Sequence, residues 1–233
     1  MNKTHGYKKL ISVFILLIMI PLVAIIGVKL FADRKYNIIS IIVAFLSCAP
    51  FFVRFEKNRS SSGEMVIISV MTSLSVIGRL MFAPIPAFKP VSAIVIITGA
   101  SLGAEAGFMV GSLSAIISNI FFGQGPWTPF QMFVWGMIGF ISGLIFRKNV
   151  KPNKFALSLI GIFGGVMFSM MMDIWTVLSL DGAFVWQRYL ASVASSLPVM
   201  AIYAVSNVIF LLILARPFCE KLTRIKIKYG YFA

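Results

Sequence analysis

The chain has 233 residues, of which 59% are hydrophobic and only 12% are charged. A soluble domain of this size could not bury so much apolar surface, so the composition excludes a soluble globular protein and indicates an integral membrane protein. The net charge of +14 comes from Lys and Arg residues in short segments between apolar runs, which excludes a basic nucleic-acid-binding domain.

The apolar runs have the lengths of membrane-spanning helices. About 15 to 25 residues suffice for a helix to cross ~30 Å of hydrocarbon, whereas a barrel would show alternating segments of about 10 residues. We therefore expect an all-α fold, a helical membrane bundle with a six-helix core in residues 61–233 and two accessory spans in residues 1–60. The predicted spans are 10–32, 37–53, 65–83, 91–104, 107–122, 130–146, 155–175 and 190–215.

Basic residues decide how often the segment 91–122 crosses the membrane. The basic clusters within 54–59 and 147–154 should both be cytoplasmic by the positive-inside rule, so an even number of crossings must separate them. Two short helices within 91–122 satisfy this condition. The same rule places most of the 21 Lys and Arg on one side, so both termini are predicted to be cytoplasmic.

Small residues predict which helices pack closely. In lipid, the close approach of backbones replaces the hydrophobic effect as the force that joins helices, and glycine permits it. The six spans from residue 65 onward should therefore form one tight bundle. The glycines concerned are Gly99, Gly103, Gly107 and Gly111, then Gly136, Gly139 and Gly143, then Gly161, Gly164 and Gly165.

The opposite, outer side receives three chemically rich loops, predicted at 84–90, 123–129 and 176–188. The strongest local pattern surrounds the second loop, where amide, indole and hydroxyl groups gather with Trp135 one helical turn inward. Such a group suits an uncharged, partly aromatic ligand that forms hydrogen bonds, although an interfacial aromatic belt would also explain the tryptophans. The candidate rim residues are Asn119, Gln124, Trp127, Thr128 and Gln131.

Two charged residues lie within predicted spans, Arg79 and Asp173. An unpaired charge in lipid costs a few kcal/mol, so both side chains should face the bundle interior. They could pair with each other or contact a substrate, and the sequence leaves both alternatives open. Lys89 and Arg188, in the first and third outer loops, complete the candidate substrate-binding set.

No enzymatic constellation is present. The sequence contains no G-x-x-x-x-G-K-[ST] phosphate loop, no H-E-x-x-H and no G-x-S-x-G motif. Two cysteines and one histidine are too few for a metal site built from Cys and His ligands. We therefore expect no catalytic residues, no cofactor and no metal. If transport consumes ATP, another chain must hydrolyse it.

From Met65 to the C-terminus the chain resembles the S-components of energy-coupling factor (ECF) transporters. The resemblance lies in six spans with rich outer loops, the run from Lys89-Pro90 to Gly99, and Gly123-Gln124-Gly125-Pro126-Trp127-Thr128-Pro129. This last run is similar to the branch assigned to cobalamin. The resemblance implies a substrate-binding subunit in the cell membrane that captures a vitamin from outside. It also implies partners: a transmembrane coupling subunit (EcfT-like) and two cytoplasmic ATPase subunits, with membrane lipid around the chain and no nucleic acid.

The family contacts its coupling subunit through an Ala-xxx-Ala pattern in the first core span. Ser69 and Ser73 stand nearest to that pattern here, although on pattern alone internal helix packing explains them better.

Three alternatives stay open at this point. The ligand could be another vitamin or precursor, such as pantothenate or a queuosine precursor. The chain could instead be an autonomous secondary transporter or channel, although it lacks the internal repeats and membrane-embedded titratable chains typical of that class. A membrane enzyme is the third.

Overall fold

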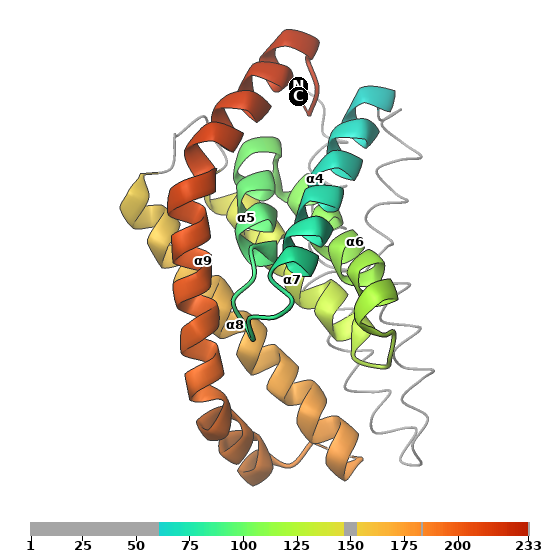
Figure 1. Ribbon diagram of the computed structural model, residues 1–233, viewed down its shortest axis with the longest axis vertical. Helices are drawn as coiled ribbons and strands as arrows, with labels where there is room; N and C mark the ends of the chain where they lie inside the picture. The colour runs from blue at the N-terminus through green and yellow to red at the C-terminus, as the bar shows by residue number, and fades with distance from the viewer. Residues whose placement is uncertain (1–60, 147–152, 183, 233) are drawn as a thin grey trace, which may run out of the picture.

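The computed structural model describes residues 61–146, 153–182 and 184–232, and every regular element in these ranges is an α-helix. The two predicted N-terminal spans and most of the basic segment 147–154 lie outside the described residues. Figure 1 shows the helices in chain order as an elongated bundle. They are α4 (Ser62–Met81), α5 (Val91–Leu102), α6 (Ala104–Phe122), α7 (Thr128–Ile145), α8 (Lys154–Asp181) and α9 (Trp186–Tyr229).

The six core spans predicted from hydropathy are all confirmed as helices. Five of them are long and apolar enough to cross a membrane, and α5 is a shorter apolar helix of 12 residues. Two helices occupy 91–122 as predicted, but only α5 is short, because α6 has 19 residues. Gly103 separates α5 from α6 with a φ of 107°, a conformation that glycine adopts without steric cost, so the chain reverses within a single residue.

The last two helices are longer than hydropathy indicated. The predicted outer loop 176–188 is wrong, because α8 continues to Asp181 and only residues 182–185 separate it from α9. Gly182, with a left-handed φ of 73°, ends α8. Hydropathy detects the apolar part of a helix and misses polar turns that extend it.

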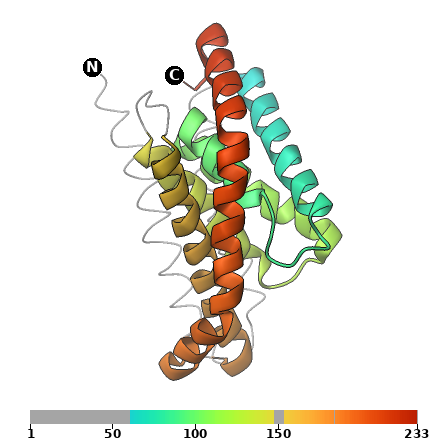
Figure 2. The same cartoon turned by 60° about the vertical axis from the view of Figure 1, so that its left-hand side comes forward.

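The other end of α9 shows the same effect. This helix has 44 residues, about 66 Å of rise, which exceeds the ~30 Å of a bilayer core. Its last turn carries Lys226 and Lys228, whose positive charges stabilise a helix C-terminus. The residues that follow the predicted span 190–215 therefore continue the same helix to Tyr229 (Figures 1 and 2).

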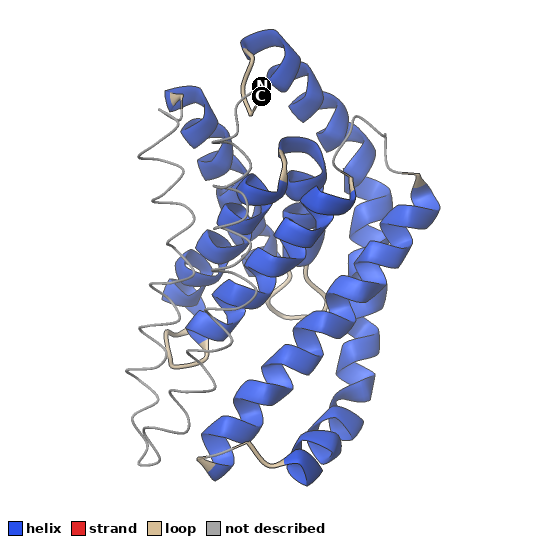
Figure 3. Ribbon diagram, turned by 180° about the vertical axis from the view of Figure 1, so that it is seen from behind, coloured by secondary structure: helices blue, strands red, loops and turns tan. Residues whose placement is uncertain are grey.

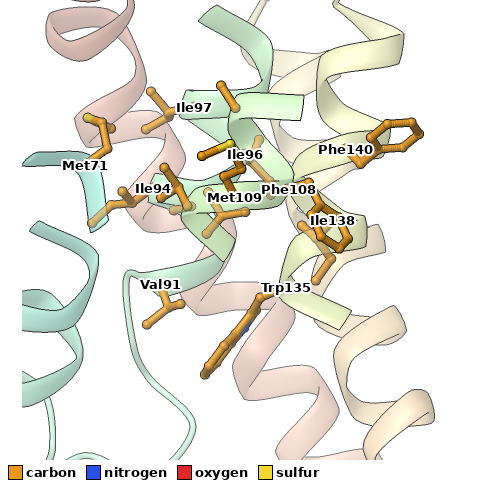
Figure 4. Close-up of a cluster of buried hydrophobic side chains, with 14 of the residues drawn as sticks. Met71, Val91, Ile94, Ile96, Ile97, Phe108, Met109, Trp135, Ile138 and Phe140 are labelled. Carbon is orange, nitrogen blue, oxygen red and sulfur yellow. The ribbon is translucent and has the colours of Figure 1, made fainter. Parts of the chain in front are cut away.

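Helix α5 lies at the centre of the bundle and contacts α4, α6, α7, α8 and α9. All of its residues except Ala100 and Ser101 are buried. Figure 4 shows its isoleucines packed against side chains of α4, α6 and α7. The view from behind in Figure 3 shows the long helices α8 and α9 beside the shorter helices of the bundle. The core is therefore built around a short helix that exposes almost no surface to lipid.

Glycines let α5, α6 and α7 approach at backbone distance. A side chain added at Gly99 or Gly107 would collide with the carbonyl of Gly139, and one at Gly111 would collide with the backbone of Trp135. The same holds between α8 and α9, where a Cβ on Gly165 would lie 2.6 Å from the amide nitrogen of Ala204. The tight bundle predicted from the glycine spacing is confirmed.

These contacts predict a large difference between two glycine-to-alanine substitutions. The methyl group of Gly139→Ala would collide with the Gly107 backbone and lie 2.7 Å from a Val95 methyl carbon, so the helices would have to separate. We expect the free energy of unfolding to fall by about 2 kcal/mol. In Gly164→Ala the nearest atoms lie at 3.4 to 3.7 Å, ordinary contact distances. The melting temperature in detergent should fall clearly for the first variant and stay near the wild-type value for the second. Equal melting temperatures would contradict the packing argument.

Candidate functional site

Arg79 lies on the inward face of α4, near the end of the helix that is predicted to face outside. Its side chain is 9% exposed, and its Nη1 donates hydrogen bonds to Ser118 Oγ and, at 2.8 Å, to Asn119 Oδ1. Both acceptors are uncharged side chains on α6. A buried guanidinium is thus held within the bundle by neutral partners rather than by a carboxylate.

Asn119 continues the hydrogen bonds from α6 to α7. Its Nδ2 donates to Thr128 Oγ1 at 2.9 Å and to Gln131 Oε1 at 2.8 Å. Because the same amide accepts from Arg79, one buried side chain joins three helices. We call these five residues the Arg79 cluster: Arg79, Ser118, Asn119, Thr128 and Gln131.

Aromatic rings surround the guanidinium. The Arg79 Cζ atom lies 4.5 Å from the centroid of the Phe122 ring and 5.0 Å from that of Trp135. Trp135 stacks on Phe168 of α8 with centroids 5.0 Å apart and planes at 17°, and Phe168 meets Tyr203 of α9 edge-on at 5.0 Å. We call Trp135, Phe168 and Tyr203 the aromatic column. In Figure 4, Trp135 lies at the lower margin of the apolar core.

The second outer loop is fastened by its own polar groups. Gln124 Nε2 donates to the carbonyl of Ile116 at 2.7 Å, and its Oε1 accepts from Thr128 Oγ1 at 3.0 Å. The ring of Trp127 lies over Gly125, and the Trp127 side chain remains 37% exposed. The amides that the sequence suggested as ligand contacts therefore already have protein partners, and Trp127 offers the accessible face of this loop.

Lys89 lies in the first outer loop, close to the Arg79 cluster. Its Nζ donates to the carbonyls of Phe82 and Ile85 at 3.3 and 3.2 Å and lies 5.9 Å from the centroid of the Phe122 ring. Burial, and then the positive charge of Arg79, lower the pKa of Lys89 below its usual value. The structure thus brings Arg79 and Lys89 to the same aromatic ring.

Asp173 lies apart from Arg79. Its two carboxylate oxygens accept hydrogen bonds from Ser192 and Ser196 of α9, both at 2.7 Å, and it forms no ion pair with Arg79. The first of the two sequence alternatives, a mutual salt bridge, is therefore absent. Arg188 pairs instead with Asp181, so this candidate joins the ends of α8 and α9 and does not contact the Arg79 cluster.

Several residues of the site escaped the sequence analysis. Phe122, Phe168 and Tyr203 resemble any aromatic residue of a membrane helix, and no spacing distinguishes them. The serines Ser192 and Ser196 are one helical turn apart, a spacing that also fits ordinary helix packing. In the described ranges there is no group of three or more His, Cys, Asp or Glu side chains suited to a metal ion.

Comparison with known protein families shows which family the chain belongs to. The family model described as "ECF-type riboflavin transporter, S component" matches residues 59–224, more than half of the sequence. No solved structure matches the chain. The match confirms the S-component type inferred from the outer-loop runs and gives no support to the cobalamin branch.

S-components bind a vitamin and work with a transmembrane coupling subunit and ATPase subunits, so this chain is a transport subunit and not an enzyme. The matched region, the six-helix core and its five membrane-length helices agree with one another. The chain therefore belongs to the family of ECF-type riboflavin transporter S components, and it is a multi-pass membrane protein.

Proposed function

We propose that the chain captures a vitamin at the predicted outer end of the bundle and delivers it together with a transmembrane coupling subunit and two ATPase subunits. The observation that supports this site is the buried guanidinium of Arg79, held by neutral side chains and faced by Phe122 and Trp135. Few polar groups converging within an apolar, aromatic surround are typical of small-molecule sites. The outward orientation of this end remains a prediction from the distribution of basic residues.

The ligand that suits this surround has a flat conjugated ring and a hydrogen-bonding periphery. Riboflavin, named in the family description, has such a ring system and a polyol chain. Cobalamin, to which the Gly123–Pro129 run pointed, has a corrin ring edged with amides. Family membership gives no support to an autonomous secondary transporter, and pantothenate or a queuosine precursor belongs in the same test as other S-component ligands.

Binding by the purified chain identifies the ligand. The full chain in detergent should be examined for a co-purifying chromophore and titrated calorimetrically with riboflavin, cobalamin, pantothenate and a queuosine precursor. We expect one of the two ring-bearing vitamins to bind more tightly than about 1 μM, as suits an uptake system for a scarce nutrient. Binding of pantothenate alone would contradict the ring proposal, and no binding to any of the four would contradict the proposed function.

The exposed face of Trp127 should contribute to ligand affinity. Truncating an aromatic residue that becomes desolvated on binding costs roughly 2 kcal/mol, about thirtyfold in affinity, so we expect this loss for Trp127→Ala. Trp186, 58% exposed at the start of α9, is a matched control because it lies on another loop and contacts Phe184 and Tyr189. Titration should show near-native affinity for Trp186→Ala. Near-native affinity in Trp127→Ala with a lowered melting temperature would favour the aromatic belt.

The face of α4 that points away from the bundle is suited to contact the coupling subunit. Ser69 and Ser73 are exposed, between the exposed side chains of Val66, Val70 and Ile77. Ser69 Oγ donates to the carbonyl of Met65, so its polar atom is satisfied without an interhelical partner. Internal packing within the described bundle therefore does not explain these serines, and their small size leaves room for close approach by another helix.

A bulky residue on this face should separate binding from transport. In Ser69→Leu and Ser73→Leu we expect normal ligand affinity in the isolated subunit and loss of uptake in cells that supply the partner subunits, because leucine would hold the two helices apart. Ser195→Leu, an equivalent change on the exposed face of α9, should leave uptake intact. Normal uptake in both α4 variants would place the coupling contact elsewhere.

A further inference from the structure

Arg79 and Lys89 are two cations that form no ion pair with any residue that the structure describes. In the described ranges the ion pairs are Arg188 with Asp181 and Arg216 with Glu220, and neither involves Arg79 or Lys89. Asp173, the buried carboxylate of the outer half of α8, is bound by serines. Two positive charges thus lie near one end of a membrane bundle, where an anion would relieve an unfavourable arrangement.

The guanidinium of Arg79 has donors to spare. Both of its hydrogen bonds use Nη1, and within the described part of the chain Nε and Nη2 have no acceptor. These two nitrogens form the fork with which arginine binds a carboxylate or phosphate through two parallel hydrogen bonds. The hydrogen bonds to Ser118 and Asn119 orient that fork, so little entropy is lost when it binds.

Lys89 adds a second cation near the same accessible ring. Phe122 is 39% exposed, with Arg79 Cζ at 4.5 Å and Lys89 Nζ at 5.9 Å from its centroid. Two of the three Lys89 protons go to the carbonyls of Phe82 and Ile85, which leaves one for a ligand. After burial, the positive charge of Arg79 is the second cause that lowers the pKa of Lys89.

A buried hydroxyl on α4 extends this donor set. Ser75 lies one helical turn before Arg79 on the same buried face, and its Oγ has no hydrogen-bond partner among the described residues. A hydroxyl left unpaired in a bundle core is costly unless something else binds it.

We propose that the transported ligand carries an anionic group, a carboxylate or a phosphate, which binds between Arg79 and Lys89 beside the Phe122 ring. This inference rests on the proposed function and narrows its ligand class. It favours a phosphorylated flavin over riboflavin itself, and it is compatible with the phosphodiester of cobalamin or the carboxylate of pantothenate. An uncharged vitamin would leave both cations without an anionic partner among the described residues.

Matched ligand pairs test the inference. The purified full chain should be titrated with flavin mononucleotide and riboflavin, with cobalamin and cobinamide, which lacks the phosphodiester, and with pantothenate and pantothenol. We expect the anionic member of the recognised pair to bind at least about tenfold more tightly, because charge-assisted hydrogen bonds are lost in the neutral member. Equal or tighter binding of the neutral member would overturn the inference while upholding vitamin binding.

Substitutions at the two cations test whether they cause the difference in affinity between the anionic and the neutral ligand. Arg79→Gln and Lys89→Gln should each reduce the difference between the paired ligands to less than about threefold, since each removes one of the two charges. Lys89 lies in a loop and is only partly buried, so its variant remains informative if Arg79→Gln fails to fold. Arg216→Gln removes a largely exposed arginine near the other end of α9 and should retain the full difference. An unchanged difference in Lys89→Gln would place the anion elsewhere.

Small anions provide a measurement that needs no vitamin. At constant ionic strength, inorganic phosphate or acetate should raise the melting temperature of the wild-type chain relative to chloride, and this rise should vanish in Lys89→Gln. A rise without binding of any vitamin would support the anion site and contradict the proposed function. No rise with either anion, together with no preference in any ligand pair, would overturn the inference.

Discussion

The arrangement of this protein depends on the backbone contact of α6 with α7 and α5. Glycine at 99, 107, 111 and 139 removes the side chains that would otherwise hold these helices apart. Close approach then brings the amide of Asn119 within hydrogen-bond distance of Thr128 and Gln131, since side chains this short cannot span a wider gap. The polar contacts of the Arg79 cluster are thus a consequence of apolar packing one to several turns away.

A membrane bundle can hold a buried arginine in two ways, with a carboxylate or with dipoles and ring faces. This chain uses the second way, because Arg79 is bound by a hydroxyl and an amide and faced by two aromatic rings. A carboxylate partner would have neutralised the charge permanently. Neutral partners position the guanidinium and leave its positive charge available, which is the state that a binding group requires.

The sequence predicted the helices more completely than the contacts between them. Hydropathy and charge parity located all six described helices, including the pair on either side of Gly103, because apolar length and basic loops follow directly from the bilayer. The same method misplaced the end of α8 and both ends of α9. There the helix continues through polar residues, which hydropathy cannot distinguish from a loop.

For the candidate site, the sequence identified residue types but not their partners. Asn119, Thr128 and Gln131 were singled out as ligand contacts, whereas in the structure Asn119 donates to both Thr128 and Gln131 and accepts from Arg79. Asp173 was considered with Arg79 because both are charged, yet its partners are two serines of α9. Pairing across helices depends on rotation and depth in the bundle, and neither quantity is encoded in spacing along one helix.

Under the proposed function, helix α4 carries both the ligand-binding face and the face that contacts the coupling subunit. The face of α4 that is buried in the bundle carries Arg79, while the opposite, exposed face carries Ser69 and Ser73. These faces belong to one rigid element, because an α-helix transmits a rotation or tilt along its whole length. A ligand that draws Arg79 toward Lys89 would therefore also move the serine face, and the partner subunit could detect occupancy without touching the ligand. For this coupling to operate, the charge of Arg79 must respond to the ligand, which a permanent salt bridge would prevent.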